Sequence, residues 1–310
     1  MQLLILCIIF LSALGILWLA VGAICFRIAV VRSLAAKTDA LKGVRSTYQE
    51  IIQTGKAWIE SQATSRVSIT SADGLRLSAR LYLHPEAKGI LLFFHGYRSC
   101  ADIDASGAAE YYYNLGYTLL LPDQRSHGQS EGRYITFGIR EKEDCVLWSQ
   151  WCVQQFGADC PQILSGLSMG ATTVLMAAGQ PLPDSVRCII ADCGFSSPAD
   201  ILRKVIRVDY HLPAWAILPA LSVYTKFCAG FSIRAYSTYA AMETNRLPIL
   251  FIHGLADTFV PCEMTQTCYA YCRAPKRLLL VEGAGHGLSF LVDMPRVKKE
   301  LQDFLAKYTA

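Results

Sequence analysis

One serine of the sequence lies in the setting that a nucleophile needs. The pentapeptide GLSMG, residues 166–170, separates an apolar strand pattern from an apolar helix pattern. A sharp turn from strand to helix exposes a serine hydroxyl, and small flanking glycines let neighbouring backbone approach it. The turn also aims the amino end of the helix at negative charge that develops on a substrate. We therefore expect Ser168 to be the nucleophile of an acyl-transfer reaction.

A serine hydroxyl is a weak nucleophile at its own pKa and needs a base, which an acidic residue orients. His286 lies in the glycine-rich loop GAGHG, directly after the last apolar strand pattern, and is the expected base. Asp257 follows the strand pattern LPILFIHG and is the expected acid. Asp192, at the end of RCIIAD, is an alternative acid, and His127, in a loop after another strand pattern, is a weaker alternative base.

Acyl transfer also needs hydrogen-bond donors for the oxyanion that forms on the substrate. The backbone N–H of Met169, the residue after the nucleophile, is one expected donor. The other is the backbone N–H of Tyr97, in the loop that follows the strand pattern ending in Phe94-His95-Gly96. The twelve cysteines contain no CxxC pair, and no other residues signal a metal or a cofactor, so none is expected.

Short apolar runs alternate with helical patterns from about residue 66 onward, which predicts a mostly parallel sheet covered by helices on both faces. The first two strand patterns, on either side of Asp73-Gly74, predict an antiparallel pair. Residues 195–246, between the strand patterns RCIIADC and PILFIHG, are rich in aromatics and helical in pattern. A connection this long predicts an inserted cap, with an ordinary large crossover as the alternative.

The first 26 residues contain no charged side chain. About 20 apolar residues cross a bilayer as a helix, so residues 1–26 predict a transmembrane anchor, with a signal peptide as the alternative. Basic side chains follow this segment, which by the positive-inside rule predicts that the rest of the chain is cytoplasmic. They are Arg27, Arg32, Lys37, Lys42, Arg45 and Lys56. The many cysteines in apolar segments favour the same reducing compartment.

Residues 27–62 predict a juxtamembrane helical stalk, packed on the domain or lying at the membrane surface. Its apolar side chains recur at helical spacing, at Leu41, Val44, Tyr48, Ile51 and Ile52. The net charge of +4 is concentrated near this stalk, which favours contact with anionic lipid. No aromatic side chains alternate with the basic ones, so a nucleic-acid partner is not expected.

These motifs together make the chain, from about residue 66 to 308, resemble the α/β-hydrolase superfamily. Its closest resemblance is to bacterial membrane-anchored α/β hydrolases related to serine aminopeptidase-like and acylaminoacyl-peptidase-like hydrolases. Besides the pentapeptide, the motifs are FHG at 94–96, DQRSHGQS at 123–130, HGLADTFVP at 253–261 and GHG at 285–287. The second motif has Ser-His where the family more often has Gly-His. In the family, that loop braces the active-site edge of the sheet and does not supply a triad residue. The departure therefore does not change the expectation of catalysis.

The resemblance implies an α/β-hydrolase domain at residues 63–310, with the cap at about 195–246 and a Ser168, Asp257, His286 triad. We expect a serine hydrolase that cleaves an ester, thioester or amide of a small-molecule or peptide acyl substrate, with a carboxylesterase as the lead. A serine peptidase is the first alternative. A non-catalytic binding protein of the same fold is the second, although the intact triad disfavours it. The sequence specifies neither the acyl group nor the oligomeric state.

Overall fold

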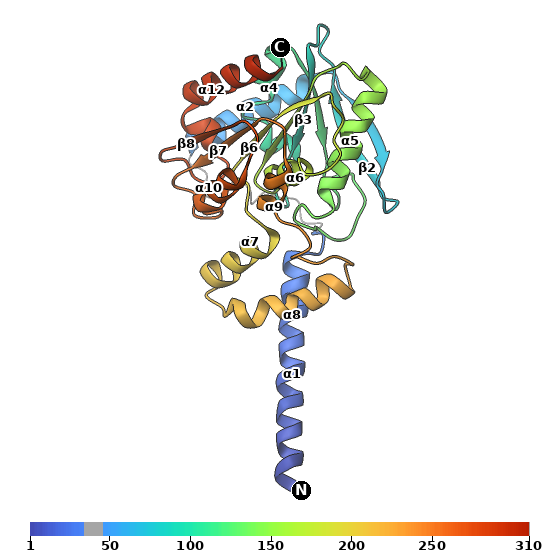
Figure 1. The fold of residues 1–310 in the computed structure, drawn as a ribbon, viewed down its shortest axis with the longest axis vertical. Helices are drawn as coiled ribbons and strands as arrows, with labels where there is room; N and C mark the ends of the chain where they lie inside the picture. Colours follow the sequence, from blue (N-terminus) through green and yellow to red (C-terminus); the bar gives the residue numbers. More distant parts are fainter. Residues whose placement is uncertain (34–45, 310) are drawn as a thin grey trace.

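The computed structural model describes residues 1–33 and 46–309. Its centre is an eight-stranded sheet in the order β1-β2-β4-β3-β5-β6-β7-β8 (Figure 1). β2 is antiparallel to both β1 and β4, and the other neighbouring pairs are parallel. The strands are β1 (Ser65–Thr70), β2 (Arg76–Tyr82), β3 (Gly89–Phe94), β4 (Tyr117–Pro122), β5 (Gln162–Leu167), β6 (Val186–Asp192), β7 (Ile249–Gly254) and β8 (Lys276–Val281). The predicted mostly parallel sheet and its antiparallel first pair are confirmed.

Helices cover both faces of the sheet, as predicted. The helical elements are α1 (Gln2–Ala29), α2 (Ser46–Ser61), α3 (Ala101–Asp104), α4 (Ala109–Asn114), α5 (Glu141–Phe156), α6 (Met169–Ala177), α7 (Pro198–Lys204), the π-helical turn η2 (Val205–Asp209), α8 (Ala214–Phe227), α9 (Thr238–Thr244), α10 (Cys262–Tyr271), α11 (Ser289–Val292) and α12 (Met294–Tyr308). Side chains of α5, α6, α9 and α10 pack in the core on one face. Side chains of α2, α3, α4 and α12 pack in the core on the other.

The packing of β3 shows why the central strands appear in the sequence as short apolar runs. Ile90, Leu92 and Phe94 pack into the core on the first face, and Leu91 and Phe93 pack into the core on the second. Successive side chains of a strand point to opposite faces, so a strand with a core on each side is apolar at every position. The loops at the carboxyl ends of β3, β5, β7 and β8 therefore emerge from one rigid edge.

The segment predicted as a cap divides into two parts. α7, η2 and α8 stand beyond the sheet domain, at the end from which α1 extends (Figure 1). α9 instead packs against α6 and α10 in the main body. Ser197 and Ser237 begin α7 and α9, and each hydroxyl accepts the N–H of the residue three positions later, the usual way to satisfy a helix N-terminus.

α1 packs against α8 through residues spaced four apart on both helices. Trp18 Nε1–H donates to Ala216 O at 2.7 Å. A Cβ atom on Gly22 would lie 2.8 Å from Ala220 Cβ, so only glycine allows this approach. The rings of Phe26 and Tyr224 follow, with centroids 5.9 Å apart. Such i, i+4 rows are the ridges through which helices commonly pack.

The carboxyl end of α1 is tied to the sheet domain. Tyr97 Oη donates to Ala29 O at 2.7 Å. Val31 forms an isolated antiparallel bridge with Tyr134. The Arg32 guanidinium donates to the backbone oxygens of residues 128 and 130, both at 2.6 Å. α1 is therefore fixed against the loops at the carboxyl edge of the sheet.

α2 packs on the sheet domain. Ile52 and Ile59 are buried, and the helix contacts α3 and α4. Tyr48 and Ile51 are half-buried. Leu41 and Val44, two of the residues used to predict the stalk, lie outside the described residues.

Candidate active site

Ser168 lies at the turn between β5 and α6, with φ of 57° and ψ of −116°. This backbone conformation is unfavourable for a residue with a Cβ atom and is stored strain at a turn. The flanking glycines make room for it. A Cβ on Gly166 would lie 2.6 Å from Ala171 N, and one on Gly170 would lie 2.8 Å from His95 O. The strand-to-helix elbow therefore needs both glycines.

The structure brings Ser168, His286 and Asp257 together. His286 Nε2 lies 2.9 Å from Ser168 Oγ, and His286 Nδ1 lies 2.7 Å from Asp257 Oδ2. A carboxylate can only accept a hydrogen bond, so Nδ1 of the neutral His286 ring carries the proton and donates a hydrogen bond to Asp257. Nε2 can then accept the proton of the serine hydroxyl. The ring of Phe259 packs edge-on against His286, with centroids 5.0 Å apart.

Asp257 is held as an acceptor from several directions. Its Oδ1 accepts the backbone N–H groups of Phe259 and Val260 at 2.8 and 2.9 Å. Its Oδ2 lies 3.2 Å from His253 Nε2. Burial acts against the charged form, but hydrogen bonds from His253 and His286 outweigh it and hold the pKa of Asp257 well below its usual range. The carboxylate is therefore ionised at neutral pH.

Asp192, the alternative acid, is engaged elsewhere. Its Oδ1 accepts from Ser289 Oγ at 3.0 Å. Burial raises the pKa of Asp192 to about 6, against opposing contributions from His253 and the Ser289 hydrogen bond. A carboxyl with this pKa is a poor partner for an imidazolium, because it ionises reluctantly. The geometry therefore favours Asp257 over Asp192.

The histidine considered as an alternative base, His127, is part of a brace. Its Nε2 accepts the backbone N–H of Arg98 at 2.9 Å, and its Nδ1 lies 2.9 Å from Arg125 O. His95 has a similar arrangement, with Nε2 accepting the N–H of Gln124 at 3.0 Å. Both rings therefore use their nitrogens to hold the loop after β3 against the loop after β4.

Met169 and Tyr97 are the two residues predicted to supply the oxyanion donors. Met169 follows the serine and is the first residue of α6, and N–H groups in the first turn of a helix have no intrahelical acceptor. Tyr97 lines both of the cavities whose walls include Ser168. In the same loop, the N–H of Gly96 donates to Asp104 Oδ2 at 2.6 Å. The donor role of the Met169 and Tyr97 N–H groups stays a prediction.

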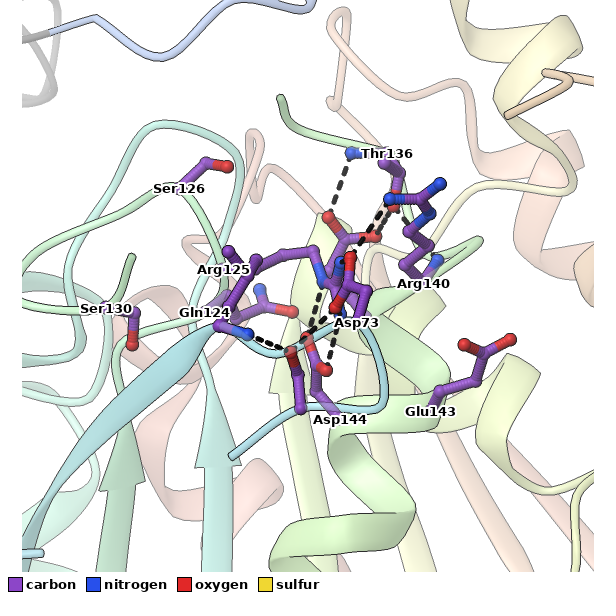
Figure 2. A network of polar contacts seen from close by, with 12 residues as sticks. Asp73, Gln124, Arg125, Ser126, Ser130, Thr136, Arg140, Glu143 and Asp144 are labelled. Atoms are coloured by element: carbon purple, nitrogen blue, oxygen red, sulfur yellow. Dashed lines mark hydrogen bonds and ion pairs between the residues drawn. The ribbon is translucent and has the colours of Figure 1, made fainter. Parts of the chain in front are cut away.

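Arg125, of the motif DQRSHGQS, is the centre of an ionic brace (Figure 2). Arg125 donates from Nε and Nη2 to the two carboxylate oxygens of Asp144, at 2.6 and 2.7 Å. It also donates from Nη1 to Asp73 at 2.9 Å. Arg140 reaches Asp73 from the other side at 3.0 Å. Bidentate pairs of this kind are strong and geometrically specific, so the brace fixes the loop between β4 and α5 to the β1–β2 turn.

Two cavities meet at Ser168. The smaller, about 310 Å³, also contacts His286 and includes Asp104 and Asp192 in its walls. The larger, about 480 Å³, extends from Ser168 to α1, α7 and η2. Both volumes fit the range of ligand sites.

One group of side chains within the described residues has donor atoms close enough to share a metal ion, namely Cys193, Asp257 and His286, all within 4.8 Å. Cys193 is fully buried, and burial raises the pKa of its thiol well above the ordinary value. A cysteine that binds metal does so as the thiolate. Asp257 and His286 already bond each other, so the donor set suits a triad better than a metal.

From the sequence, His253 has only a structural role at the end of its strand, and its contact with Asp257 is known from the structure alone. Its Nδ1 lies 2.7 Å from Thr265 Oγ1, and its Nε2 lies 2.9 Å from Val260 O. Burial acts to lower its pKa, but the hydrogen bonds to Asp257 and Val260 O outweigh it and raise the pKa. The motif HGLADTFVP places His253 four residues before Asp257, with a short turn between them. This spacing was the signal in the sequence that the two side chains could meet.

Comparisons with known proteins agree with this fold. A family model described as "alpha/beta hydrolase fold" matches residues 89–224. The uncharacterized protein YqkD of Bacillus subtilis is 32% identical over 194 residues, which cover 63% of this chain and 64% of YqkD, just under two thirds. The uncharacterized membrane protein YNL320W of Saccharomyces cerevisiae is 26% identical over 162 residues, 52% of this chain and 51% of that protein.

The solved structures point the same way. The Pyrococcus furiosus esterase Pf2001 superimposes with a TM-score of 0.66 at 21% identity, and the match covers 81% of this chain and 94% of the esterase. At this identity the likeness concerns the fold. Together with the sheet order and the family match, it shows that the chain has the fold of the α/β-hydrolase superfamily.

Proposed function

We propose that the protein is a serine hydrolase that cleaves a carboxylic ester through an acyl-serine intermediate. The observation that carries this proposal is the continuous hydrogen-bonded chain from Ser168 Oγ through His286 to Asp257. Nucleophile, base and orienting acid in this arrangement define the catalytic geometry of serine hydrolases. Two cavities whose walls both include the serine give the two halves of an ester a place to lie.

The chemistry follows from the atoms at the site. Ser168 Oγ attacks the ester carbonyl carbon while its proton passes to His286 Nε2. The negative charge on the carbonyl oxygen is stabilised by the N–H groups of Met169 and Tyr97. The intermediate collapses, the bond to the alcohol oxygen breaks, and His286 gives its proton to that oxygen. Water, activated by the same ring, then releases the acid and restores the serine.

The role of Asp257 is to stabilise the imidazolium that forms in each step. Its depressed pKa keeps it ionised throughout, so the proton stays on His286 until the leaving group takes it.

An ester is favoured over an aminoacyl substrate by the cavity walls. An aminopeptidase would need a free carboxylate to bind the substrate amine. Asp104 accepts from Gly96 N and Ser99 Oγ, and Asp192 accepts from Ser289. Among the described residues, the two acidic side chains that line the smaller cavity thus already accept hydrogen bonds within the protein.

α1 is proposed to anchor the enzyme in a membrane, with the hydrolase domain on the cytoplasmic side. It is long and apolar enough to cross a bilayer, and its side chains from Gln2 to Ala20 are exposed. Arg27 and Arg32 follow the span on the side of the domain.

Active-site labelling tests the proposal. The full-length protein in lipid nanodiscs is treated with a fluorophosphonate probe, and hydrolysis of p-nitrophenyl acetate is compared with that of aminoacyl amides. We expect labelling and ester hydrolysis, both lost in Ser168→Ala and both kept in Ser61→Ala, an exposed serine at the end of α2. Labelling that persists in Ser168→Ala would overturn the nucleophile. A preference for the amides would overturn the esterase.

A further inference from the structure

The larger cavity at Ser168 is apolar almost throughout. α1 contributes one wall, with side chains that include Ile24 and Cys25, and α7 and η2 contribute the facing wall, with Leu202 and Val205. Among the described residues that line it, Arg98 is the one with a charge, and its guanidinium donates to Ile28 O and Val31 O at the end of α1. A cavity of about 480 Å³ with such walls suits a hydrocarbon group and disfavours a polar one.

The contacts of α1 place this cavity close to the membrane surface. The side chains of α1 from Gln2 to Ala20 are exposed, and a helical run of about 20 apolar residues is what crosses the hydrocarbon core of a bilayer. Trp18 lies within this run and bonds Ala216 of α8. An anchor that spans the bilayer thus draws α8 into the membrane surface.

The surface of the cap fits this position. Five of its large apolar side chains are exposed, namely Val208, Tyr210, Leu212, Trp215 and Phe227, with Trp215 at 84% and Phe227 at 78%. Arg203, Arg207 and Arg234 line a recess together with Trp215. Tryptophan and basic side chains side by side are typical of the boundary between hydrocarbon and lipid headgroups. α8 crosses α1 where the free half of that helix begins (Figure 1).

We infer that the substrate is a membrane-resident lipid ester whose long acyl chain enters the larger cavity directly from the bilayer, between α1 and the cap. This inference rests on the proposed function, because it requires Ser168 to attack the ester carbonyl. With the acyl chain in the apolar cavity, the carbonyl lies where the two cavities meet. The alcohol half then occupies the smaller cavity, whose walls include Ser99, Asp104 and Asp192.

Acyl-chain dependence tests the inference on the full-length protein in nanodiscs. The probes are p-nitrophenyl esters from acetyl to palmitoyl, and dipalmitoylglycerol incorporated in the nanodisc. Each methylene buried in the cavity should raise kcat/KM about fourfold until the cavity is full. We expect palmitate release from dipalmitoylglycerol as well.

Tryptophan substitutions in the two walls locate the chain. Cys25→Trp on α1 and Val205→Trp on η2 each take space from the cavity, so the palmitoyl-to-acetyl ratio of kcat/KM should fall. Loss of room for two methylenes corresponds to about sixteenfold. Leu11→Trp, on the exposed part of α1, should leave the ratio unchanged. The two substitutions lie on different elements, so if one variant misfolds the other still tests whether the acyl chain lies in the cavity.

The outcomes separate the two proposals. Ser168-dependent hydrolysis of the acetyl ester with no gain from longer chains would overturn the acyl-chain inference and leave the esterase standing. Release of palmitate from an S-palmitoylated peptide and not from dipalmitoylglycerol would overturn the lipid ester as the substrate. Absence of both labelling and turnover with every ester would overturn the proposed function itself.

Discussion

The exchange of Asp257 for asparagine is the sharpest test of how the site works. An asparagine can keep its amide oxygen on the N–H groups of Phe259 and Val260, which hold Oδ1 of the aspartate at 2.8 and 2.9 Å. Its NH₂ group then faces His286 Nδ1, where the aspartate accepts at 2.7 Å. A donor at that position forces the ring proton onto Nε2, so His286 no longer accepts the serine proton.

The expected loss is large in rate and small in stability. A wrong tautomer in a serine protease triad lowers kcat about 10⁴-fold, which corresponds to about 5 kcal/mol of transition-state stabilisation. The backbone contacts of the side chain remain, but Oδ2 no longer accepts from His253, so the melting temperature should fall modestly while the variant stays folded at the assay temperature. Steady-state kcat with p-nitrophenyl acetate and a thermal melt measure the two quantities on the same preparation.

Asp192→Asn is the matched control. This carboxyl also follows a core strand, but it bonds Ser289, so its substitution should leave kcat within a fewfold of the wild type. A near-normal kcat for Asp257→Asn, with collapse for Asp192→Asn at an unchanged melting temperature, would refute the reasoning and give the role to Asp192.

Three other predictions follow from the described contacts. Arg125→Met leaves Asp144 buried without its bidentate partner, so it should lower the free energy of unfolding in urea melts by about 3–5 kcal/mol. Arg140 is a half-exposed partner of Asp73, so Arg140→Met should lower it by under about 1 kcal/mol. Burial raises the pKa of Asp192 from 3.8 to about 6, so its contribution to stability is full below pH 3.8 and is lost as pH rises through 6. Asp192→Asn should therefore gain about 2.5 kcal/mol over wild type between pH 4 and pH 8, at about 1.4 kcal/mol per pKa unit. An equal difference at both pH values in urea melts would contradict this. In intact cells, cysteines placed beyond residue 60 should resist a membrane-impermeant thiol reagent, and their modification would reverse the proposed orientation.

The sheet and the residues at its edge were predictable from sequence because their patterns are local. Buried parallel strands are short apolar runs, so the strand that ends at Phe94 and the one that ends at Asp192 are visible in the sequence. Ser168 and His286 stand in glycine-rich turns directly after such runs. Parallel strands bring their carboxyl ends to one edge, which places these residues together before any contact is known.

The packing of α1 could not be read in the same way. A helix that faces lipid and a helix that packs against a cap are both apolar, so nothing in the sequence distinguishes Leu11 from Phe26. Gly22 gave no signal either, because its close approach to Ala220 depends on a partner about two hundred residues later. The ion pair of Arg125 with Asp144 and the contact of His253 with Asp257 likewise depend on side-chain directions that only the folded chain defines.

The attachment of α1 bears on how the protein is prepared. Val31 pairs with Tyr134, and Tyr97 donates to Ala29 O, so the helix end is part of the wall around Ser168. Deletion of residues 1–30, the usual way to make an anchored enzyme soluble, would remove that wall and uncover Phe137, Leu202 and Leu221. The truncated fragment would have a wider entrance to the larger cavity and more exposed apolar surface. We therefore expect it to aggregate more readily and to accept a broader range of substrates than the full-length protein. Substrate specificity measured on the fragment would not describe the full-length protein, because residues of α1 form part of the cavity wall that includes Ser168.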